Sequence, residues 1–397
     1  MQRFKSSIDR SFLSWEMSFR VISSLLAVSL ISVALGGCGL LTPPPDDTKG
    51  VRKWLVVPVF YATNRTLDTE QISPNYSEVP NGEGLLFGVK NIAVPVPINS
   101  PLEPDTLARM QWQEIQEDAT SKDGAPPVDG KKYQVTESTL DRDQVVQQLN
   151  SYMKTSGSKE IVIFVHGCCA TFDTSMKRAA RLSAHMQVPV VLYDWVSPKG
   201  FSKYLANETM AQQSYDDFWR FLNNTEKIVK PGNISLVGHS MGALILDQAI
   251  VRRSAQRQTS SVCPPLFNEL IMSNADMDAK TFLNHAGLFN ANASKTRIYI
   301  STKDSRMEAS AISHGGFNRL GEPGNLTNEL SSIEGQEIID VTANETGHEL
   351  PFWIVANFHR FGNLGPVKDF ASKSIRPNLI KIVRTGATQD SSTPMLK

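Results

Sequence analysis

Between residues 160 and 341, short apolar runs alternate with longer segments whose apolar residues recur at helical spacing. A run with almost no polar interruption is typical of a strand that is buried on both faces of a sheet. The predicted strands are residues 161–165, 188–193, 234–237, 270–273, 297–302 and 336–341, and the predicted helices are residues 173–186, 206–230 and the segment that ends near 255. Repeated strand–helix units predict an α/β fold, with a mostly parallel sheet and helices on both faces.

The region before residue 160 has a different pattern. Residues 55–63 and 86–96 are rich in apolar and β-branched side chains and are predicted to be strands, and residues 140–153 to be a helix. Residues 121–132 contain several Gly, Pro and Asp residues and are predicted to be a surface loop, with a short strand over 133–135. Together with the strand–helix units, these segments are expected to form one domain over residues 51–370.

One pentapeptide stands out for its chemistry. The apolar run that begins at Ile234 enters Gly238-His239-Ser240-Met241-Gly242, and an apolar helical pattern leaves it. A strand, a sharp turn and a helix are the context of a nucleophile elbow, in which the central serine lies on a strained turn. Small residues are needed on either side, because a side chain there would collide with the strand or the helix. We therefore expect Ser240 to be a nucleophile.

Further motifs occur in a fixed order along the chain. They are Val59-Phe60-Tyr61-Ala62-Thr63-Asn64-Arg65, Phe87-Gly88-Val89, His166-Gly167 with Lys177-Arg178-Ala179-Ala180, Tyr193-Asp194-Trp195, Gly238 to Gly242, Ala275-Asp276-Met277-Asp278, Ser301-Thr302-Lys303-Asp304 and Arg319-Leu320-Gly321. With these motifs the chain resembles the α/β-hydrolase superfamily from Val57 to about Phe361, and more closely a group of bacterial esterase/lipase-like envelope proteins. The resemblance implies ester or related acyl hydrolysis and does not name a substrate. The chain departs from the pattern at Cys168-Cys169, where an aromatic residue and an asparagine are expected.

The order of catalytic groups in this fold is serine, acid, histidine. Asp304 follows the predicted strand 297–302 and is the expected acid, which would orient the imidazole and stabilise its charged form. Asp276 is the runner-up and Asp278 the third candidate, since both follow the preceding strand. His348 follows the last predicted strand and is the expected base, with competitors at positions 314 and 359. We expect His166 and His239 to be structural.

Two backbone N–H groups are expected to bind the oxyanion. One belongs to Met241, at the start of the helix that follows the serine, and the other to Cys168, in the loop after the strand 161–165. Gly167 would let this loop approach the site closely. A disulfide from Cys263 is not expected, because Cys263 should lie at the opposite edge of the sheet. Free thiols and a bridge between Cys168 and Cys169 both remain open.

The N-terminus has the layout of an export signal. An apolar run over residues 21–35 follows Arg20 and is short for a membrane span. The sequence Leu35-Gly36-Gly37-Cys38 resembles the lipobox of bacterial lipoproteins, in which the cysteine is acylated, and Gly39 favours the outer membrane. We expect a signal peptide over residues 1–37, with Met17 as an alternative start, a proline-containing tether over 38–50 and a C-terminal tail over 371–397.

Composition narrows the function further. Lys and Arg together number 40, as do Asp and Glu, so the formal net charge is zero, whereas a nucleic-acid partner would favour a basic excess. The seven histidines are scattered, so neither a metal nor another cofactor is expected. The expected partners are an ester substrate and, through the lipid anchor, a membrane. An acyltransferase with the same triad and a non-catalytic envelope binding protein remain the alternatives.

Overall fold

The computed structural model describes residues 52–68, 75–96, 109–110, 113–117, 138–259, 266–344, 347–362 and 381–383. The expected signal peptide, Cys38, the tether, the loop 121–132, the strand 133–135 and Cys263 lie outside these residues. Within them, every helix is too short or too polar to cross a lipid bilayer.

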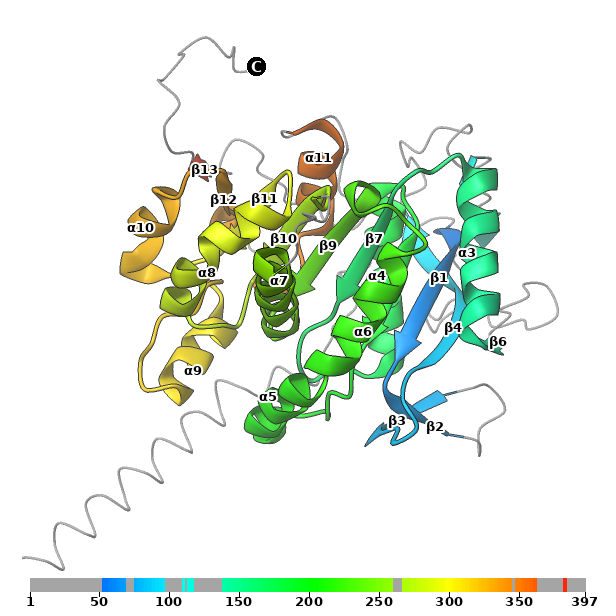
Figure 1. The fold of residues 1–397 in the computed structure, drawn as a ribbon, viewed down its shortest axis with the longest axis horizontal. Coiled ribbons are helices and arrows are strands. Elements are labelled where there is room, and N and C mark those ends of the chain that lie inside the picture. The colour runs from blue at the N-terminus through cyan, green and yellow to red at the C-terminus, as the bar shows by residue number, and fades with distance from the viewer. Residues whose placement is uncertain are drawn as a thin grey trace, which may run out of the picture. The chain divides into compact units, whose positions relative to one another are not determined.

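The centre of the protein is an eleven-stranded sheet in the order β13-β12-β11-β10-β9-β7-β8-β1-β4-β6, with β5 paired to β1 (Figure 1). The strands are β1 (Arg52–Thr63), β4 (Leu86–Val96), β5 (Gln113–Glu117), β6 (Ser138–Leu140), β7 (Ile161–Val165), β8 (Val190–Asp194), β9 (Ile234–His239), β10 (Glu269–Ser273), β11 (Thr296–Ile300), β12 (Gln336–Asp340) and β13 (Lys381–Val383). The path from β12 to β1 is parallel throughout, whereas β4, β5, β6 and β13 pair antiparallel. The mostly parallel sheet predicted from the sequence is confirmed.

Helices cover both faces of this sheet (Figure 1). They are α3 (Arg142–Ser156), α4 (Phe172–Met186), α5 (Tyr204–Gln213), α6 (Tyr215–Glu226), α7 (Gly242–Thr259), α8 (Ala279–Asn292), α9 (Ser305–Ser313), α10 (Thr327–Ser331) and α11 (Phe352–Phe361). The core against α4 and α11 contains Val162 and Phe164 of β7, and the core against α3, α6, α7 and α8 contains Ile161, Ile163 and Val165. Alternate residues of one strand thus enter opposite cores, which is why the apolar runs are continuous.

Two features at the ends of the sheet extend the sequence-based picture. A separate hairpin, β2 (Arg65–Asp68) with β3 (Asn75–Pro80), follows β1 directly. At the other edge β13 pairs with β12, so the sheet includes residues beyond position 370, where the domain was expected to end.

The single helix predicted over residues 206–230 is wrong. The chain forms α5 and α6 instead, with Ser214 between them at φ −81° and ψ −8°. The Ser214 carbonyl accepts a hydrogen bond from the hydroxyl of Tyr193 at 3.1 Å, and the Ser214 hydroxyl accepts one from the side-chain amide of Asn64 at 3.0 Å. Tyr193 belongs to β8 and Asn64 follows β1, so both partners of Ser214 lie outside the helical segment. The spacing of apolar residues within residues 206–230 therefore could not predict the break.

The turn between β9 and α7 is closed by contacts that only glycine permits. A Cβ atom on Gly242 would lie 2.4 Å from the carbonyl oxygens of both Val165 and His166. A Cβ atom on Gly167 would lie 2.6 Å from the Cβ atom of Ser240. Both distances are well inside van der Waals contact, so the end of β7 and the turn after β9 pack backbone to backbone.

We predict that Gly242→Ala lowers the free energy of unfolding by about 2 kcal/mol or more, because backbone atoms of β7 would have to move to admit the methyl group. Gly287→Ala is the matched control: Gly287 is exposed within α8, and a Cβ atom there would meet nothing within 4 Å. This control should stabilise the protein by roughly 0.5–1 kcal/mol, since alanine favours a helix interior over glycine. Urea unfolding measures both changes, and equal midpoints for the two variants would contradict the packing argument.

Candidate active site

Ser240 occupies a strained backbone conformation at the end of β9. Its φ angle is +52°, which serine rarely adopts, and the residue is 1% exposed. Neighbouring backbone groups hold it there: the Ser240 N–H donates to the Ser273 carbonyl, and the Ser240 carbonyl accepts from the N–H groups of Ala243 and Asp276, all at 3.0 Å. The sharp turn expected from the pentapeptide is therefore present, and the hydroxyl lies at the carboxyl edge of the sheet.

The three side chains expected from the sequence to act together are in hydrogen-bond contact. Nε2 of His348 lies 2.8 Å from Oγ of Ser240, and Nδ1 of His348 lies 2.8 Å from Oδ2 of Asp304. A carboxylate beside Nδ1 favours the tautomer that carries its proton there, which leaves Nε2 able to accept the serine proton. Ser240 and His348, which are 108 positions apart in the chain, thus meet with Asp304 in one relay.

Asp304 is placed by the helix that follows it. Its Oδ1 accepts hydrogen bonds from the backbone N–H groups of Arg306 and Met307 at the start of α9, which leaves Oδ2 directed at His348. Burial raises the pKa of Asp304, but the charge and hydrogen bond of His348, with further hydrogen bonds from Asn274 and Met307, lower it below its usual value. Asp304 is therefore an anion at neutral pH, as a group that stabilises an imidazolium must be.

Asn274 was not identified as a site residue from the sequence. Its Nδ2 donates to Oδ2 of Asp304 and to the carbonyl of Gly347, both at 3.0 Å, so it links the acid to the loop that carries His348. Its φ angle is +46°, a conformation in which asparagine is enriched among non-glycine residues. The sequence feature that could have identified Asn274 as a site residue is its position directly after a buried strand.

His239 also contacts the base. Its Nε2 lies 2.9 Å from the backbone carbonyl oxygen of His348. Burial, together with the charge of His348, lowers the pKa of His239 to about 3, so its ring is neutral at physiological pH and Nε2–H donates to that carbonyl. His239 is thus a structural residue, as expected, and it fixes the backbone of the residue that contacts Ser240.

The loop after β7 lies against the serine. Gly167 approaches the Cβ atom of Ser240 as described above, and the expected oxyanion donor Cys168 is the next residue. Among the described residues, the N–H of Met241 has no hydrogen-bond acceptor, and it precedes the first residue of α7. An unpaired N–H at a helix start favours negative charge. Cys168 and Cys169 are not joined by a disulfide in this structure.

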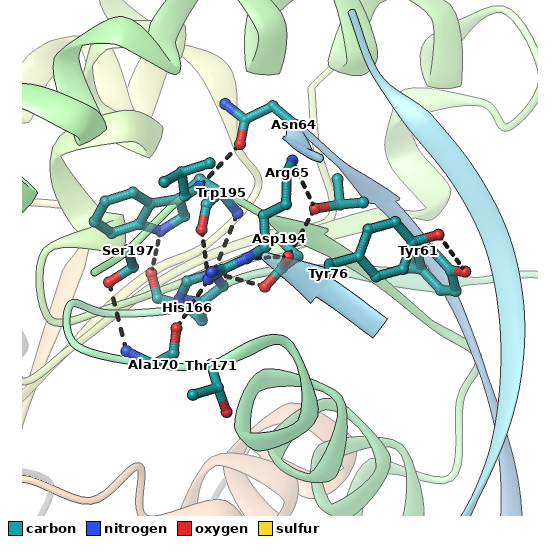
Figure 2. A network of polar contacts seen from close by, with 12 residues as sticks. Tyr61, Asn64, Arg65, Tyr76, His166, Ala170, Thr171, Asp194, Trp195 and Ser197 are labelled. Carbon is teal, nitrogen blue, oxygen red and sulfur yellow. Dashed lines mark hydrogen bonds and ion pairs between the residues drawn. The ribbon is translucent and has the colours of Figure 1, made fainter. Parts of the chain in front are cut away.

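A buried ion pair supports this loop from behind (Figure 2). Nε of Arg65 lies 2.7 Å from Oδ2 of Asp194, and both side chains are 0% exposed. Nη2 of Arg65 also donates to the carbonyls of Ala170 and Trp195, at 2.8 and 2.9 Å. Burial raises the pKa of Asp194, but Arg65 and then His166 lower it below its usual value, so the pair is ionised.

His166 holds the first residue of the loop in place through contacts with Trp195. Its Nε2 accepts a hydrogen bond from the backbone N–H of Trp195 at 3.1 Å, and its carbonyl accepts one from the Trp195 indole at 2.8 Å. The two rings stack at 5.3 Å (Figure 2). The loop from His166 to Ala170 is therefore held at both ends by residues of β2 and of the segment that follows β8.

The other candidates from the sequence have different partners. Asp276 accepts hydrogen bonds from the hydroxyls of Tyr204 and Ser310 at 2.6 Å and pairs with Arg319 at 2.9 Å. The remaining three are Asp278, which caps α8; His314, which pairs with Glu208; and His359, which lies between Glu160 and Glu269. Of the candidate acids and bases, the structure brings Asp304 and His348 to the serine.

Beyond the serine, the structure bears on a metal site and on a ligand cavity. The described residues include no cluster of His, Cys, Asp or Glu side chains suited to a metal ion. A cavity of about 490 Å³ opens between α3 and α6, and its lining includes Phe87, Leu149 and Phe221 but none of the three relay residues. The cavity is therefore separate from the hydroxyl of Ser240.

The comparison with protein-family models agrees with this architecture. A family model described as an alpha/beta hydrolase of unknown function (DUF900) matches residues 141–356. A lipase-esterase related protein from Clostridium acetobutylicum ATCC 824 is 14% identical, with a TM-score of 0.28, over 51% of this chain and 90% of its own. A putative cell surface hydrolase from Lactobacillus plantarum WCFS1 is 12% identical, with a TM-score of 0.32, over the same shares. A search of curated proteins gives no match.

We predict that Arg65→Met destabilises the protein by about 3–5 kcal/mol, because Asp194 would remain buried without its counter-charge. Arg142→Met is the control, since the Arg142–Asp143 pair has side chains that are 53% and 75% exposed. An exposed pair of this kind contributes about 0–1 kcal/mol. Denaturant unfolding compares the two variants, and a loss at Arg65 no larger than that at Arg142 would rule out a structural role for the buried pair.

Proposed function

Because the chain belongs to an alpha/beta hydrolase family, we propose that it is a serine hydrolase that cleaves ester bonds through an acyl-enzyme on Ser240. The observation that supports this proposal most directly is the relay of two 2.8 Å contacts that joins Ser240, His348 and Asp304. A neutral imidazole in contact with a serine hydroxyl and oriented by a carboxylate is the arrangement that converts serine into a nucleophile.

In the proposed reaction, Nε2 of His348 takes the proton of Ser240 as Oγ attacks the ester carbonyl. The charge that develops on the imidazole is stabilised by Asp304, which does not itself accept the proton. The N–H groups of Met241 and Cys168 would bind the oxyanion of the tetrahedral intermediate. The imidazolium then protonates the leaving alcohol, and a water molecule, activated by the same imidazole, releases the acid.

The surrounding residues support this chemistry by fixing distances. His239 and Asn274 hold the backbone on either side of the base, through the carbonyls of His348 and Gly347. Arg65 and His166 hold the ends of the loop that carries the Cys168 N–H. Donors fixed in advance need no reorganisation as charge develops, which is the main advantage of such a site over water.

We predict that Ser240→Ala lowers the hydrolysis of short p-nitrophenyl esters by at least about 1000-fold, because the acyl-enzyme cannot form. Labelling by a fluorophosphonate probe should disappear in the same variant. Ser332→Ala, at an exposed serine after α10, is the matched control and should leave both readouts unchanged. Wild-type rates in the Ser240→Ala variant would refute the proposal, and absence of probe labelling in the wild type would favour a binding protein on a hydrolase scaffold.

We further propose that Cys38 is acylated and anchors the domain to the bacterial cell envelope, in the outer membrane and facing the periplasm. The support is the sequence Leu35-Gly36-Gly37-Cys38 after an apolar run, followed by a proline-containing segment that would hold the domain away from the lipid. A lipid anchor of this kind would bring the site close to membrane esters.

We expect the wild-type chain, expressed in a Gram-negative bacterium, to incorporate a clickable fatty acid and to partition with the membrane fraction. Cys38→Ser should lose the label, because the thiol is the acylation site, while Cys263→Ser should keep it. Label retained after Cys38→Ser would show that this cysteine is not the anchor.

A further inference from the structure

Two adjacent thiols lie in the loop that carries a proposed oxyanion donor. Cys168 and Cys169 are both half-buried and are not joined by a disulfide, and Cys168 packs against the hydrophobic core. The Cys169 sulfur lies 3.7 Å from the carbonyl oxygen of Gly200 and 3.8 Å from the side-chain amide of Asn207. Neither thiol has a part in the proposed hydrolysis, where only the backbone of Cys168 acts.

Cys169 is held in an unusual backbone conformation. Its φ angle is +60°, in the left-handed region where asparagine and glycine are favoured and cysteine is not. The positive φ angle is less favourable in free energy for cysteine than for asparagine. The presence of a thiol at this position therefore needs an explanation.

The surroundings make Cys169 the more reactive of a potential pair. A hydrogen bond from the Cys168 thiol lowers the pKa of Cys169, as does the charge of Arg306, and together they outweigh the opposing effect of burial. Since the thiolate is the nucleophile in disulfide exchange, a lowered pKa increases the reactive fraction at neutral pH. The neighbouring Cys168 is placed to resolve whatever forms on Cys169.

Geometry determines what a bridge between these residues would do. Adjacent Cα atoms across a trans peptide are about 3.8 Å apart, whereas disulfides usually need about 4.4–6.8 Å. The loop cannot relieve this mismatch at its ends, because His166 is fixed to Trp195 and the carbonyl of Ala170 to Arg65 (Figure 2). A bridge therefore distorts the peptide unit between Cys168 and Cys169, and because both ends of the loop are fixed, the distortion extends to the preceding peptide unit, which carries the N–H of Cys168.

We propose that Cys168 and Cys169 form a reversible dithiol–disulfide site that inactivates the hydrolase by displacing the Cys168 N–H; the effect on activity rests on the function proposed above. The Cys169 thiolate attacks one sulfur of a low-molecular-weight disulfide, which breaks its S–S bond and releases one thiolate. The Cys168 thiolate then attacks the Cys169 sulfur, which forms the bridge and releases the second. Two protein thiols are oxidised and one small disulfide is reduced, and the two protons that the protein thiols lose pass through solvent to the two released thiolates, which leave as thiols.

Such a bridge would be easy to reverse. Strained disulfides have more oxidising potentials than structural ones, so mild thiols reduce them. If the domain lies in the cell envelope as proposed, it also meets an oxidising compartment in which disulfides form. The site would thus respond to the local thiol–disulfide balance.

The full chain, incubated with oxidised glutathione and then with dithiothreitol, tests the proposal. The tryptic peptide between Lys159 and Lys177 contains both thiols and no other cysteine, so its mass reports the bridge directly. We expect this peptide to lose two hydrogens while ester hydrolysis falls roughly 100-fold, the usual effect of losing one oxyanion donor, and both to recover with dithiothreitol.

Two variants separate the roles of the thiols. Cys169→Asn should hydrolyse esters at the wild-type rate and become insensitive to oxidised glutathione, because asparagine accepts the backbone conformation and no bridge can form. In Cys168→Ala, Cys169 should accumulate one glutathione that is not released, which identifies it as the attacking thiol. A wild-type peptide that keeps both thiols, or that carries only mixed disulfides, would overturn the proposal.

Failure of the hydrolase proposal is distinguishable from failure of this one. If the reduced wild type hydrolyses no ester, the peptide mass still reports the bridge, and hydrogen exchange over residues 166–171 reports the loop. The bridge should increase exchange there, and Cys169→Asn should show no change with oxidised glutathione. A bridge that forms with neither hydrolysis nor exchange altered would show that the loop does not respond to it.

Discussion

The site depends on how closely the turn after β9 can approach the end of β7. Gly242 rests on the carbonyls of Val165 and His166, and Gly167 rests on Ser240, at distances that no other residue type allows. This contact holds the serine in its strained conformation and places the loop that contains Cys168 beside it. The strain is maintained because backbone hydrogen bonds to Ser273, Asp276 and Ala243 fix the serine backbone.

Several polar residues around this turn make hydrogen bonds that position His348 and the loop that contains it. Asp304 caps α9 with one oxygen and contacts His348 with the other. Asn274 holds both Asp304 and the Gly347 carbonyl, and His239 holds the carbonyl of His348. His348 is therefore positioned through its backbone as well as its ring, which limits the conformations that its loop can adopt.

The loop after β7 is restrained at both ends and contains two adjacent cysteines between them. The buried Arg65–Asp194 pair and the His166–Trp195 contacts restrain residues 166 and 170, while two thiols lie between them. Burying the arginine and the aspartate is costly, and the hydrogen bonds to the carbonyls of Ala170 and Trp195 help to offset that cost. Because both ends are restrained, a chemical change between residues 166 and 170 would alter the conformation of the short backbone segment beside Ser240.

The sequence by itself determined the strands of the parallel sheet, the strand–turn–helix unit at Ser240 and the positions of Asp304 and His348 after strands, because apolar runs, glycine spacing and strand ends are local signals. Only the tertiary structure decided the helix break at Ser214, which depends on Asn64 and Tyr193, and the hydrogen-bond partners of Asn274 and His239. It also joined Arg65 to Asp194 across 129 positions. Such contacts depend on which strands become neighbours in the sheet, and the apolar periodicity of one segment does not show which other segments will pack against it.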